Sequence, residues 1–450
     1  MGASTPNIAK PMPKRESKPL IKWKDAELDA FALLTHQRHH TVAVYPEDFT
    51  PGMESVPKQT REIIGKKLDD ELSMKFRLKK AGESTRFAFI DLFAGIGGFR
   101  LAGENSGGKC IFTSEKDKYA RISYYHNFGE MPFGDINVLT NEQNIGKIPD
   151  HEVLCGGFPC QAFSISGKRL GFADERGVLF YKIRDILQDK IKKKVPVKIV
   201  FLENVRNFRN HGTPKGNTFK IIREELESLG YKVADVVLNS GQLGAATKRE
   251  RIYIVAIHEM SFPRKSLESF LKDFTSLEAL REGGIPLKDH TEELSSDEID
   301  PYLIPTERIM TKIEVINSKD EYAKKVRLHQ PIQIGQIGKK GDHRKGRQGE
   351  RIYSIHGQSI TFSAYGGGLA ARTGAYLINN QVRKLTPKEC AKIMGFVRKT
   401  DNGKTTMDVR GLNKLGLSDW QLYKQFGNSV VVSTVERIYQ LIADHFFAED

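Results

Sequence analysis

Short apolar runs alternate with helical patterns between residues 87 and 258. The runs are hydrophobic at nearly every position, which is typical of strands buried on both faces of a parallel sheet. The segments between them carry apolar residues three or four positions apart, which is typical of amphipathic helices. This alternation predicts the α/β class, with a doubly wound, mostly parallel sheet. The predicted strands begin at Phe87, Cys110, Leu154, Lys198, Tyr231 and Arg251.

The chain outside this part has a different pattern, and we expect four segments. Residues 1–86 are rich in proline and charge, which predicts an N-terminal extension, partly disordered or helical. Residues 87–261 hold the alternating pattern. Residues 262–380 combine short strands, polar loops and a basic block, which predicts a smaller, mixed, basic second domain. Residues 381–450 return to a packed pattern, and we expect their last part to rejoin the first domain.

The first predicted strand enters a glycine turn that opens a helix, with Gly95 and Gly97 in the turn. Glycine lets the backbone approach a ligand closely, and a helix N-terminus offers free N–H groups. The next strand ends at Glu115, where an acidic side chain is the usual ligand of a ribose hydroxyl. Asp135 follows another turn and suits an adenine amino group, although a surface turn would also place an aspartate there. These positions predict a site for an adenosine cofactor.

NAD and S-adenosylmethionine are the competing cofactors for this site. Arg100 stands where the third glycine of the dinucleotide fingerprint belongs. This departure favours S-adenosylmethionine. A NAD-linked oxidoreductase is the alternative, and no constellation for hydride transfer supports it.

A cysteine and a glutamate follow two of the central strands. Cys160 ends a Gly-Gly-Phe-Pro-Cys turn, where a thiol is well placed as a nucleophile, although a lone cysteine is often only a buried apolar residue. Residues 167–177 form a loop rich in glycine and charge, and a long mobile loop that begins at a candidate nucleophile is often a lid. Glu203 ends the next buried strand, and glutamate is rarely buried without a task. We therefore expect chemistry at this edge of the sheet.

Composition adds a preference for a polyanionic partner. The 450 residues are 39% hydrophobic and 28% charged, with a net charge of +14. Many basic proteins bind no nucleic acid, but the charge here is also concentrated. Residues 319–351 hold ten Lys or Arg against four Asp or Glu, with glycines between them. Such a segment suits a DNA backbone and groove, or forms a solvated loop.

Cysteine usage and hydropathy argue against several other classes. Only Cys110, Cys155, Cys160 and Cys390 are present, with no CxxC pair, so we expect neither a disulfide framework nor a metal site. No stretch is apolar for long enough to cross a bilayer, and the first residues lack a signal pattern. We expect a cytoplasmic protein with no membrane partner.

Six motifs occur in an order that resembles the bacterial DNA cytosine-5 methyltransferase family, over roughly residues 87–450. Within that family, the stretch 348–368 is most similar to the HhaI-type branch. The motifs are Asp91–Gly98, Gly157–Gln161, Glu203–Val205, Lys248–Arg251, Arg383–Pro387 and Gly427–Val430.

The resemblance implies a Rossmann-like, S-adenosylmethionine-dependent catalytic domain over 87–261, a target-recognition domain over 262–380, and DNA (cytosine-5-)-methyltransferase activity. Cytosine C5 is a weak nucleophile, so Cys160 would first add to C6 as a thiolate. Glu203 would hold N3 and the exocyclic amine, while Arg249 and Arg251 would steady the base and both side chains. The residues implied at the cofactor are Phe93, Gly95, Gly97, Glu115, Asp135, Leu179, Asn428 and Ser429.

Access to a stacked base requires base flipping, so the resemblance implies double-stranded DNA as the partner. Ser166 and Gln348 would fill the vacated space, Arg351 and Tyr365 would touch bases or their neighbours, and Thr361 a phosphate. We expect a monomer that methylates a short GCGC-like or GCNGC-like site, with any cognate restriction endonuclease acting separately.

Three positions depart from the family pattern. Thr247 stands where glutamine usually precedes the arginine pair, and Lys116 where an aromatic often packs on adenine. Residues 342–347 form an insertion in the recognition loop, which is why a site split by an extra base is considered. A silent DNA-binding protein and a tRNA methyltransferase are further alternatives; the intact Cys160 and Glu203 disfavour the first, and the long basic segment the second.

Overall fold

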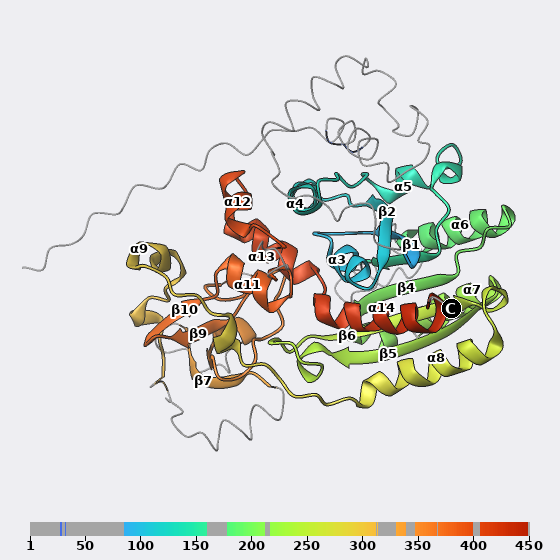
Figure 1. The fold of residues 1–450 in the computed structure, drawn as a ribbon. Coiled ribbons are helices and arrows are strands. Elements are labelled where there is room, and N and C mark those ends of the chain that lie inside the picture. Colours follow the sequence, from blue (N-terminus) through green and yellow to red (C-terminus); the bar gives the residue numbers. More distant parts are fainter. Residues whose placement is uncertain are drawn as a thin grey trace, which may run out of the picture.

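The structure is a computed structural model of the whole chain (Figure 1). Cys160, Ser166, most of the insertion at 342–347, and all of the N-terminal extension except Leu28, Ala32, Thr85 and Arg86 lie outside the described residues. The described residues are 85–159, 178–211, 217–311, 313, 330–338, 347–366, 368–398 and 406–448, with Leu28 and Ala32.

A six-stranded sheet forms the larger part of the described fold, in the order β2-β1-β3-β4-β6-β5. The first four of these pair in parallel, whereas β6 is antiparallel to both of its neighbours. The predicted doubly wound, mostly parallel sheet is therefore confirmed. The strands are β1 (Phe87–Leu92), β2 (Gly108–Ser114), β3 (Val153–Gly157), β4 (Ile199–Val205), β5 (Tyr231–Asn239) and β6 (Glu250–His258).

Helices pack on this sheet in two groups (Figure 1). In one group the last helix of the chain lies against an early helix, α3, and against α8. In the other, α6 contacts both α5 and α7. The helices are α3 (Gly98–Asn105), α4 (Lys118–Phe128), α5 (Ile136–Leu139), α6 (Val178–Lys192), α7 (Asn217–Ser228), α8 (Arg264–Ser276) and α14 (Val432–Phe446).

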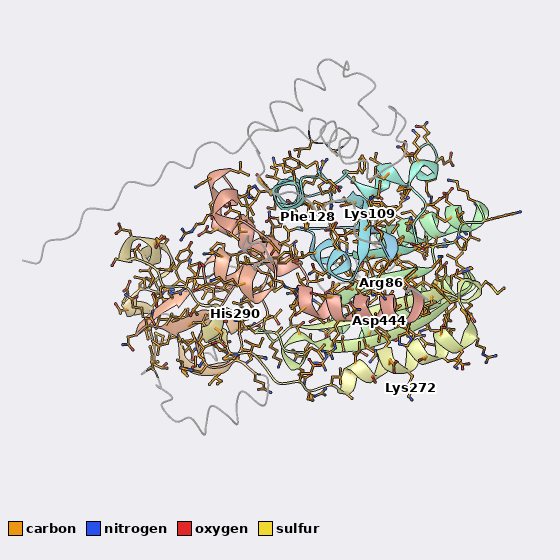
Figure 2. All side chains as sticks on the ribbon, in the orientation of Figure 1. Arg86, Lys109, Phe128, Lys272, His290 and Asp444 are labelled. Atoms are coloured by element: carbon orange, nitrogen blue, oxygen red, sulfur yellow. The ribbon has the colours of Figure 1, made fainter. Side chains whose placement is uncertain are left out.

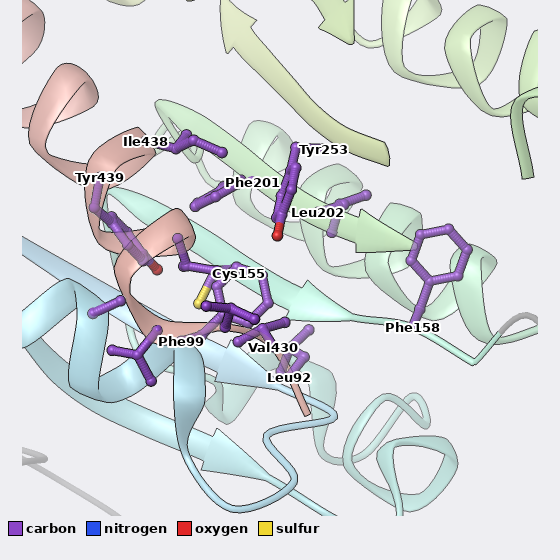
Figure 3. Packing of buried hydrophobic residues seen from close by; sticks show 14 of the residues in the cluster. Leu92, Phe99, Cys155, Phe158, Phe201, Leu202, Tyr253, Val430, Ile438 and Tyr439 are labelled. Carbon is purple, nitrogen blue, oxygen red and sulfur yellow. The ribbon is translucent and has the colours of Figure 1, made fainter. Parts of the chain in front are cut away.

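The core of the larger sheet joins residues from both ends of the described chain. Tyr439 of α14 packs edge-on against Phe201 of β4, with ring centroids 5.1 Å apart, and Phe99 of α3 lies 5.2 Å from the same ring (Figure 3). At the end of α14, Asp444 pairs with Arg86, just before β1, at 3.1 Å (Figure 2). The last helix therefore fixes the strand that leads into the glycine turn.

A second, mixed sheet has the order β10-β9-β8-β7. β8 and β9 are parallel, and the other two pairs are antiparallel. This sheet has its own apolar cluster, which includes Ile304, Ile334 and Val382. Its strands are β7 (Ile332–Gln336), β8 (Arg351–Ser354), β9 (Ala375–Ile378) and β10 (Gln381–Lys384).

Two of the predicted domain boundaries separate segments that pack together in the structure. β10 begins at Gln381, so the boundary expected after residue 380 would cut the β9–β10 hairpin. Helix α8 follows the boundary expected at 262, yet Phe270 belongs to the core of the larger sheet. Both shifts follow from pairing and packing partners that are remote in sequence. The division itself stays a prediction.

Three further helices lie between β10 and α14. They are α11 (Pro387–Ile393), α12 (Val409–Lys414) and α13 (Asp419–Asn428). α13 begins with a capping box, in which the Ser418 backbone N–H donates to the Gln421 side chain at 2.8 Å. In Figure 1 this helix lies between the smaller sheet and α3.

Candidate active site

A cavity of about 590 Å³ opens at the carboxyl ends of β1 to β4. Ligands bind at this edge in open α/β sheets. Ten of the residues proposed from the sequence line the cavity, and α13 and the segments that follow β1 to β4 supply most of the rest of its wall. The ten residues are Phe93, Gly95, Glu115, Asp135, Leu179, Glu203, Arg249, Arg251, Tyr365 and Asn428.

The turn after β1 has an unusual backbone. Gly95 and Gly97 have φ of 57° and 85°, and Phe93 has φ of 57°, a left-handed conformation that is costly for an aromatic residue. Gly97 does not line the cavity; a Cβ there would lie 2.2 Å from the Phe128 ring, so this position requires glycine. The strained turn places Phe93 on the cavity wall.

Glu115 ties this turn to the end of β2. Its carboxylate accepts hydrogen bonds from the backbone N–H groups of Gly95 and Asp117, both at 2.7 Å. Burial raises its pKa, and the two backbone hydrogen bonds oppose the rise. Each oxygen keeps a further acceptor position, which fits a pair of ribose hydroxyls.

Asp135 is the second acidic residue of the cofactor half of the cavity, which we define by Phe93, Gly95, Glu115 and Asp135. Its Oδ1 accepts from the backbone and side-chain nitrogens of Asn137, both at 3.0 Å, and its Oδ2 lies 2.6 Å from Lys116 Nζ. Burial raises the pKa of Asp135, but the hydrogen bond and charge of Lys116 outweigh it, and the net direction is downward. A charged carboxylate here can accept from an adenine amino group.

Glu203 and Arg251 lie in the other part of the cavity, the base half, which we define by Glu203, Arg249 and Arg251. Glu203 pairs in register with Gly157 at the end of β3, three positions before Cys160. The guanidinium of Arg251 lies 2.9 Å from its carboxylate. Burial raises the pKa of Glu203, and the charges of Arg251 and Arg249 partly offset the rise. The net direction of the pKa shift is upward.

Arg249 is buried beside this pair, with only 3% of its surface exposed. Its Nη2 donates to the carbonyls of Gly427, at 3.1 Å, and Ser429. Its Nε and Nη1 have no hydrogen-bond partner among the described residues. Burial and the nearby Arg251 lower its pKa to about 9. Two unused donors on a buried guanidinium suit an anion or a carbonyl oxygen in the cavity.

The end of β4 also holds the turn that leads to Cys160. The Asn204 side chain donates to the carbonyl of Phe158 at 3.1 Å, and its own oxygen accepts from the Val205 backbone. Pro159, the residue directly before Cys160, lines the cavity. The proposed nucleophile Cys160 and the proposed DNA contact Ser166 lie outside the described residues.

The other proposed DNA contacts are spread around the cavity mouth. Tyr365 lies on the cavity wall with 59% of its surface exposed. Thr361 lines an adjoining hollow of about 300 Å³ with Lys248 and Arg206, and its hydroxyl donates to the Lys248 carbonyl. Gln348 is near it and donates to the Thr361 carbonyl at 3.3 Å. Arg351 begins β8 and is half-buried, outside the cavity lining.

Thr247, one of the departures from the family pattern, has a structural partner. It is fully buried, forms a β-bridge with Ser359, and donates to the Ile360 carbonyl at 3.2 Å. The buried side chain of Gln358 donates to the carbonyls of Gly241 and Ala245 at 2.8 and 3.2 Å. The segment before Arg249 is thus joined directly to the segment that carries Thr361.

Of α13, only Asn428, the last residue of the helix, was proposed from the sequence, and the residues before it were missed. Trp420, Gln421, Lys424 and Gln425 line the cavity, and Lys424 pairs with Asp117 at 2.8 Å. The Ser418 and Gln421 spacing is a capping-box signal that predicts the helix start. No local signal indicates which helix face meets a turn some 300 residues earlier in the chain.

The described part of the chain has neither a cluster of metal-binding side chains nor a helix that could span a membrane. It holds no group of three or more His, Cys, Asp or Glu side chains that could bind a metal ion. None of its helices is both long and apolar enough to cross a membrane.

Comparison with known proteins gives the family. The model of the C-5 cytosine-specific DNA methylase family matches residues 87–444. The type II methyltransferase M.HhaI of Haemophilus parahaemolyticus is 41% identical over 367 residues, 80% of this chain and 95% of the relative. M.HpaII of Haemophilus parainfluenzae is 37% identical over 365 residues, 78% of this chain and 87% of the relative.

Solved structures support the same fold. The Entamoeba histolytica methyltransferase EhMeth aligns with a TM-score of 0.55 at 21% identity, over 79% of this chain and 98% of that one. Dnmt2 of S. pombe aligns with a TM-score of 0.53 at 15% identity, over 80% and 98%. With the family match over most of its length, the chain belongs to the C-5 cytosine-specific DNA methylase family and is an S-adenosylmethionine-dependent DNA cytosine-5 methyltransferase.

Proposed function

We propose that this enzyme methylates C5 of a flipped-out cytosine in duplex DNA through a covalent adduct between Cys160 and C6. One observation carries the proposal. Glu203 and Arg251 form an ion pair beside Gly157 of the motif that ends at Cys160, in the cavity that also contains Glu115 and Asp135. A base and an adenosine cofactor could therefore meet between the two halves.

The cofactor half fits S-adenosylmethionine by the chemistry of its donors and acceptors. Glu115 and Asp135 are acceptors for ribose hydroxyls and an adenine amine, and Phe93 lines the same cavity with an aromatic ring. Leu179 and Asn428 extend the same wall, while Gly95 leaves room for close approach, since a Cβ there would meet nothing within 4 Å. The bound cofactor supplies the electrophilic methyl group.

The base half fits the activation of cytosine. The Cys160 thiolate adds to C6. The electron pair of the C5–C6 double bond then forms a C4–C5 double bond, and the C4–N3 pair moves to N3, which takes a proton from Glu203, whose pKa burial raises. Arg249 stabilises developing negative charge with its free donors. When C5 takes the methyl group, the C4–N3 double bond re-forms and the N3 proton returns to Glu203. The C5 proton then leaves to a base, its electron pair re-forms the C5–C6 double bond, and the C6–S bond breaks to release the Cys160 thiolate.

DNA would approach the cavity from the side of the smaller sheet. Tyr365 and Arg351 would contact bases or their neighbours, Thr361 a phosphate near Lys248, and Gln348 and Ser166 the space left by the flipped base. The net charge of +14 supports a polyanionic substrate. We propose a short GCGC-like or GCNGC-like site and a monomeric, cytoplasmic enzyme.

The relatives are named type II methyltransferases. We therefore propose a place in a restriction-modification system, with any partner endonuclease acting as a separate protein. Methylation of every copy of one short sequence would then protect these sites from the endonuclease.

Expression in a bacterial host that lacks cytosine methylation tests the function. We expect bisulfite sequencing to show protected cytosines in one short motif with the wild-type chain, and none with Cys160→Ala. Full conversion with soluble wild-type protein present would contradict a DNA substrate. Transfer of labelled methyl groups to purified tRNA would then test an RNA substrate.

A further inference from the structure

Trp420 is an exposed aromatic residue at the rim of the active-site cavity. It is the second residue of α13, lines the cavity, and keeps 58% of its surface exposed. The guanidinium carbon of Arg372 lies over its ring, 4.2 Å from the centroid. This distance is well within the range of cation–π attraction. The indole is thus paired on one side and open on the other.

Arg372 connects Trp420 to the loop 363–372. Its Nη1 donates to the carbonyl of Ala364 at 2.6 Å, and its own carbonyl accepts from the Ser363 N–H at 3.0 Å. Both bonds hold the two residues that directly precede Tyr365, the proposed DNA contact. The next residue, Gly366, has φ of 143°, so the loop leaves Tyr365 through a backbone conformation that glycine favours. Arg372 is therefore a main constraint on where the Tyr365 backbone lies.

Helix α13, which carries Trp420, makes contacts of its own with α4 and its N-cap. One helical turn after Trp420, Lys424 pairs with Asp117 at 2.8 Å, beside the cofactor carboxylate Glu115. Gln425 accepts a hydrogen bond from the buried Ser123 hydroxyl, also at 2.8 Å. The helix that presents the indole is thus joined to α4 and its N-cap Asp117, independently of the loop 363–372.

We propose that Trp420 is a specificity-determining positioning residue, which acts through Arg372 to hold the recognition loop 363–372 in register with the catalytic cavity. The proposal rests on the proposed function, because it requires Tyr365 to face DNA. A loop held from a fixed helix presents Tyr365 in one place, and a wrong base pair then cannot be accommodated by a small shift. Without this contact, the loop adapts to more sequences.

The test compares methylation of the cognate duplex with that of duplexes changed at one base pair, once the cognate site is known. We expect Trp420→Ala to lower the ratio of the two kcat/KM values by roughly two- to fivefold, the range of an exposed cation–π contact. Trp420→Phe should keep most of the ratio, since a ring remains. Arg372→Met should match Trp420→Ala, and the double variant should lose no more than either alone.

Met260→Ala is the matched control, because Met260 is 89% exposed and does not line the cavity. A wild-type ratio in Trp420→Ala and Arg372→Met, at unchanged melting temperature, would overturn the proposal while leaving the methyltransferase function intact. Absence of methylation by the wild type would reject the proposed function, and this proposal with it.

Fluorescence gives a second readout that a purely structural role would not change. The chain has two tryptophans, Trp23 and Trp420, so Trp23→Phe leaves one reporter. We expect cognate DNA to change the emission of Trp420 more than unrelated DNA does, because loop docking alters the stacked guanidinium. Equal changes with both duplexes would contradict the inference.

Discussion

The Glu203 carboxylate and the Arg251 guanidinium lie 2.9 Å apart, although they come from strands that run in opposite directions. Their side chains are only 11% and 13% exposed. A paired, largely desolvated carboxylate keeps a fixed orientation toward whatever enters the cavity. In the proposed function, the same pair would set both the position of the base and the protonation state of the group that holds it.

Glu203→Gln tests this role. The amide has the same shape but cannot deliver a proton or balance Arg251, so we expect single-turnover methyl transfer to fall about 100-fold or more. Cofactor affinity, measured by calorimetry, should change less than twofold. Glu250→Gln is the control, because Glu250 pairs with the exposed Arg206. Equal rates for Glu203→Gln and the wild type would reject proton delivery by Glu203.

Cys160→Ala tests covalent catalysis. We expect no methyl transfer, with DNA and cofactor affinities within about threefold of the wild type, because the thiol contributes to chemistry rather than binding. Duplexes with 5-fluorocytosine give a direct readout, since fluorine at C5 cannot leave as the proton does and the adduct should persist in denaturing gels. Cys390→Ala is the control for a buried cysteine in α11. An adduct formed by Cys160→Ala would contradict the assignment.

Lys116→Ala tests the ion pair in the cofactor half. Lys116 pairs with Asp135 although 77% of its side chain is exposed, so the pair is worth at most about 1 kcal/mol. Removing the lysine frees Asp135 for the adenine amine, and we expect cofactor affinity to rise up to about fivefold. Asp135→Asn should weaken it instead. Weaker binding by Lys116→Ala would mean that the ammonium itself contacts the cofactor.

Gln358→Leu tests the connection between the two sheets. The buried amide donates to two carbonyls, and leaving them unpaired should cost about 1–3 kcal/mol in the free energy of unfolding, measured in urea. Gly241→Ala should act on the same contact, because its Cβ would lie 2.2 Å from the Gln358 amide oxygen. Losses that add fully in the double variant would argue against a shared contact.

Asp91→Asn tests a pH dependence. Burial raises the pKa of Asp91 to about 8, although the Arg100 backbone N–H and charge oppose the rise. The folded state thus holds the proton more tightly than the unfolded chain, so this contribution to stability is present at low pH and is lost from about pH 4 through about pH 8. Asp91→Asn should unfold with a flatter pH dependence across that window. If the stabilities of the wild type and the variant changed with pH in the same way, the pKa of Asp91 would not be raised in the folded state.

Much of the site could be predicted because it follows strand order. The carboxyl ends of parallel strands share an edge, so Gly95, Glu115 and Glu203 were expected together, and they line one cavity. The contribution of α13 could not be predicted in this way. Trp420 and Lys424 are one turn apart on a helix, but only tertiary packing decides that this face meets Arg372 and Asp117.

The direction of β6 decides which segment of the chain reaches the edge of the sheet that carries the cavity. A parallel strand brings only the segment after it to that edge, whereas an antiparallel strand brings the segment before it. Because Arg251 opposes Val205 in the register, the segment before β6 reaches the edge at which β4 ends. That segment bridges to Ser359 through Thr247. One inverted strand thus joins the segment that carries Arg249 and Arg251 to the segment after β8, so that, in the proposed function, the fit of a DNA sequence at the second sheet would reach the two arginines.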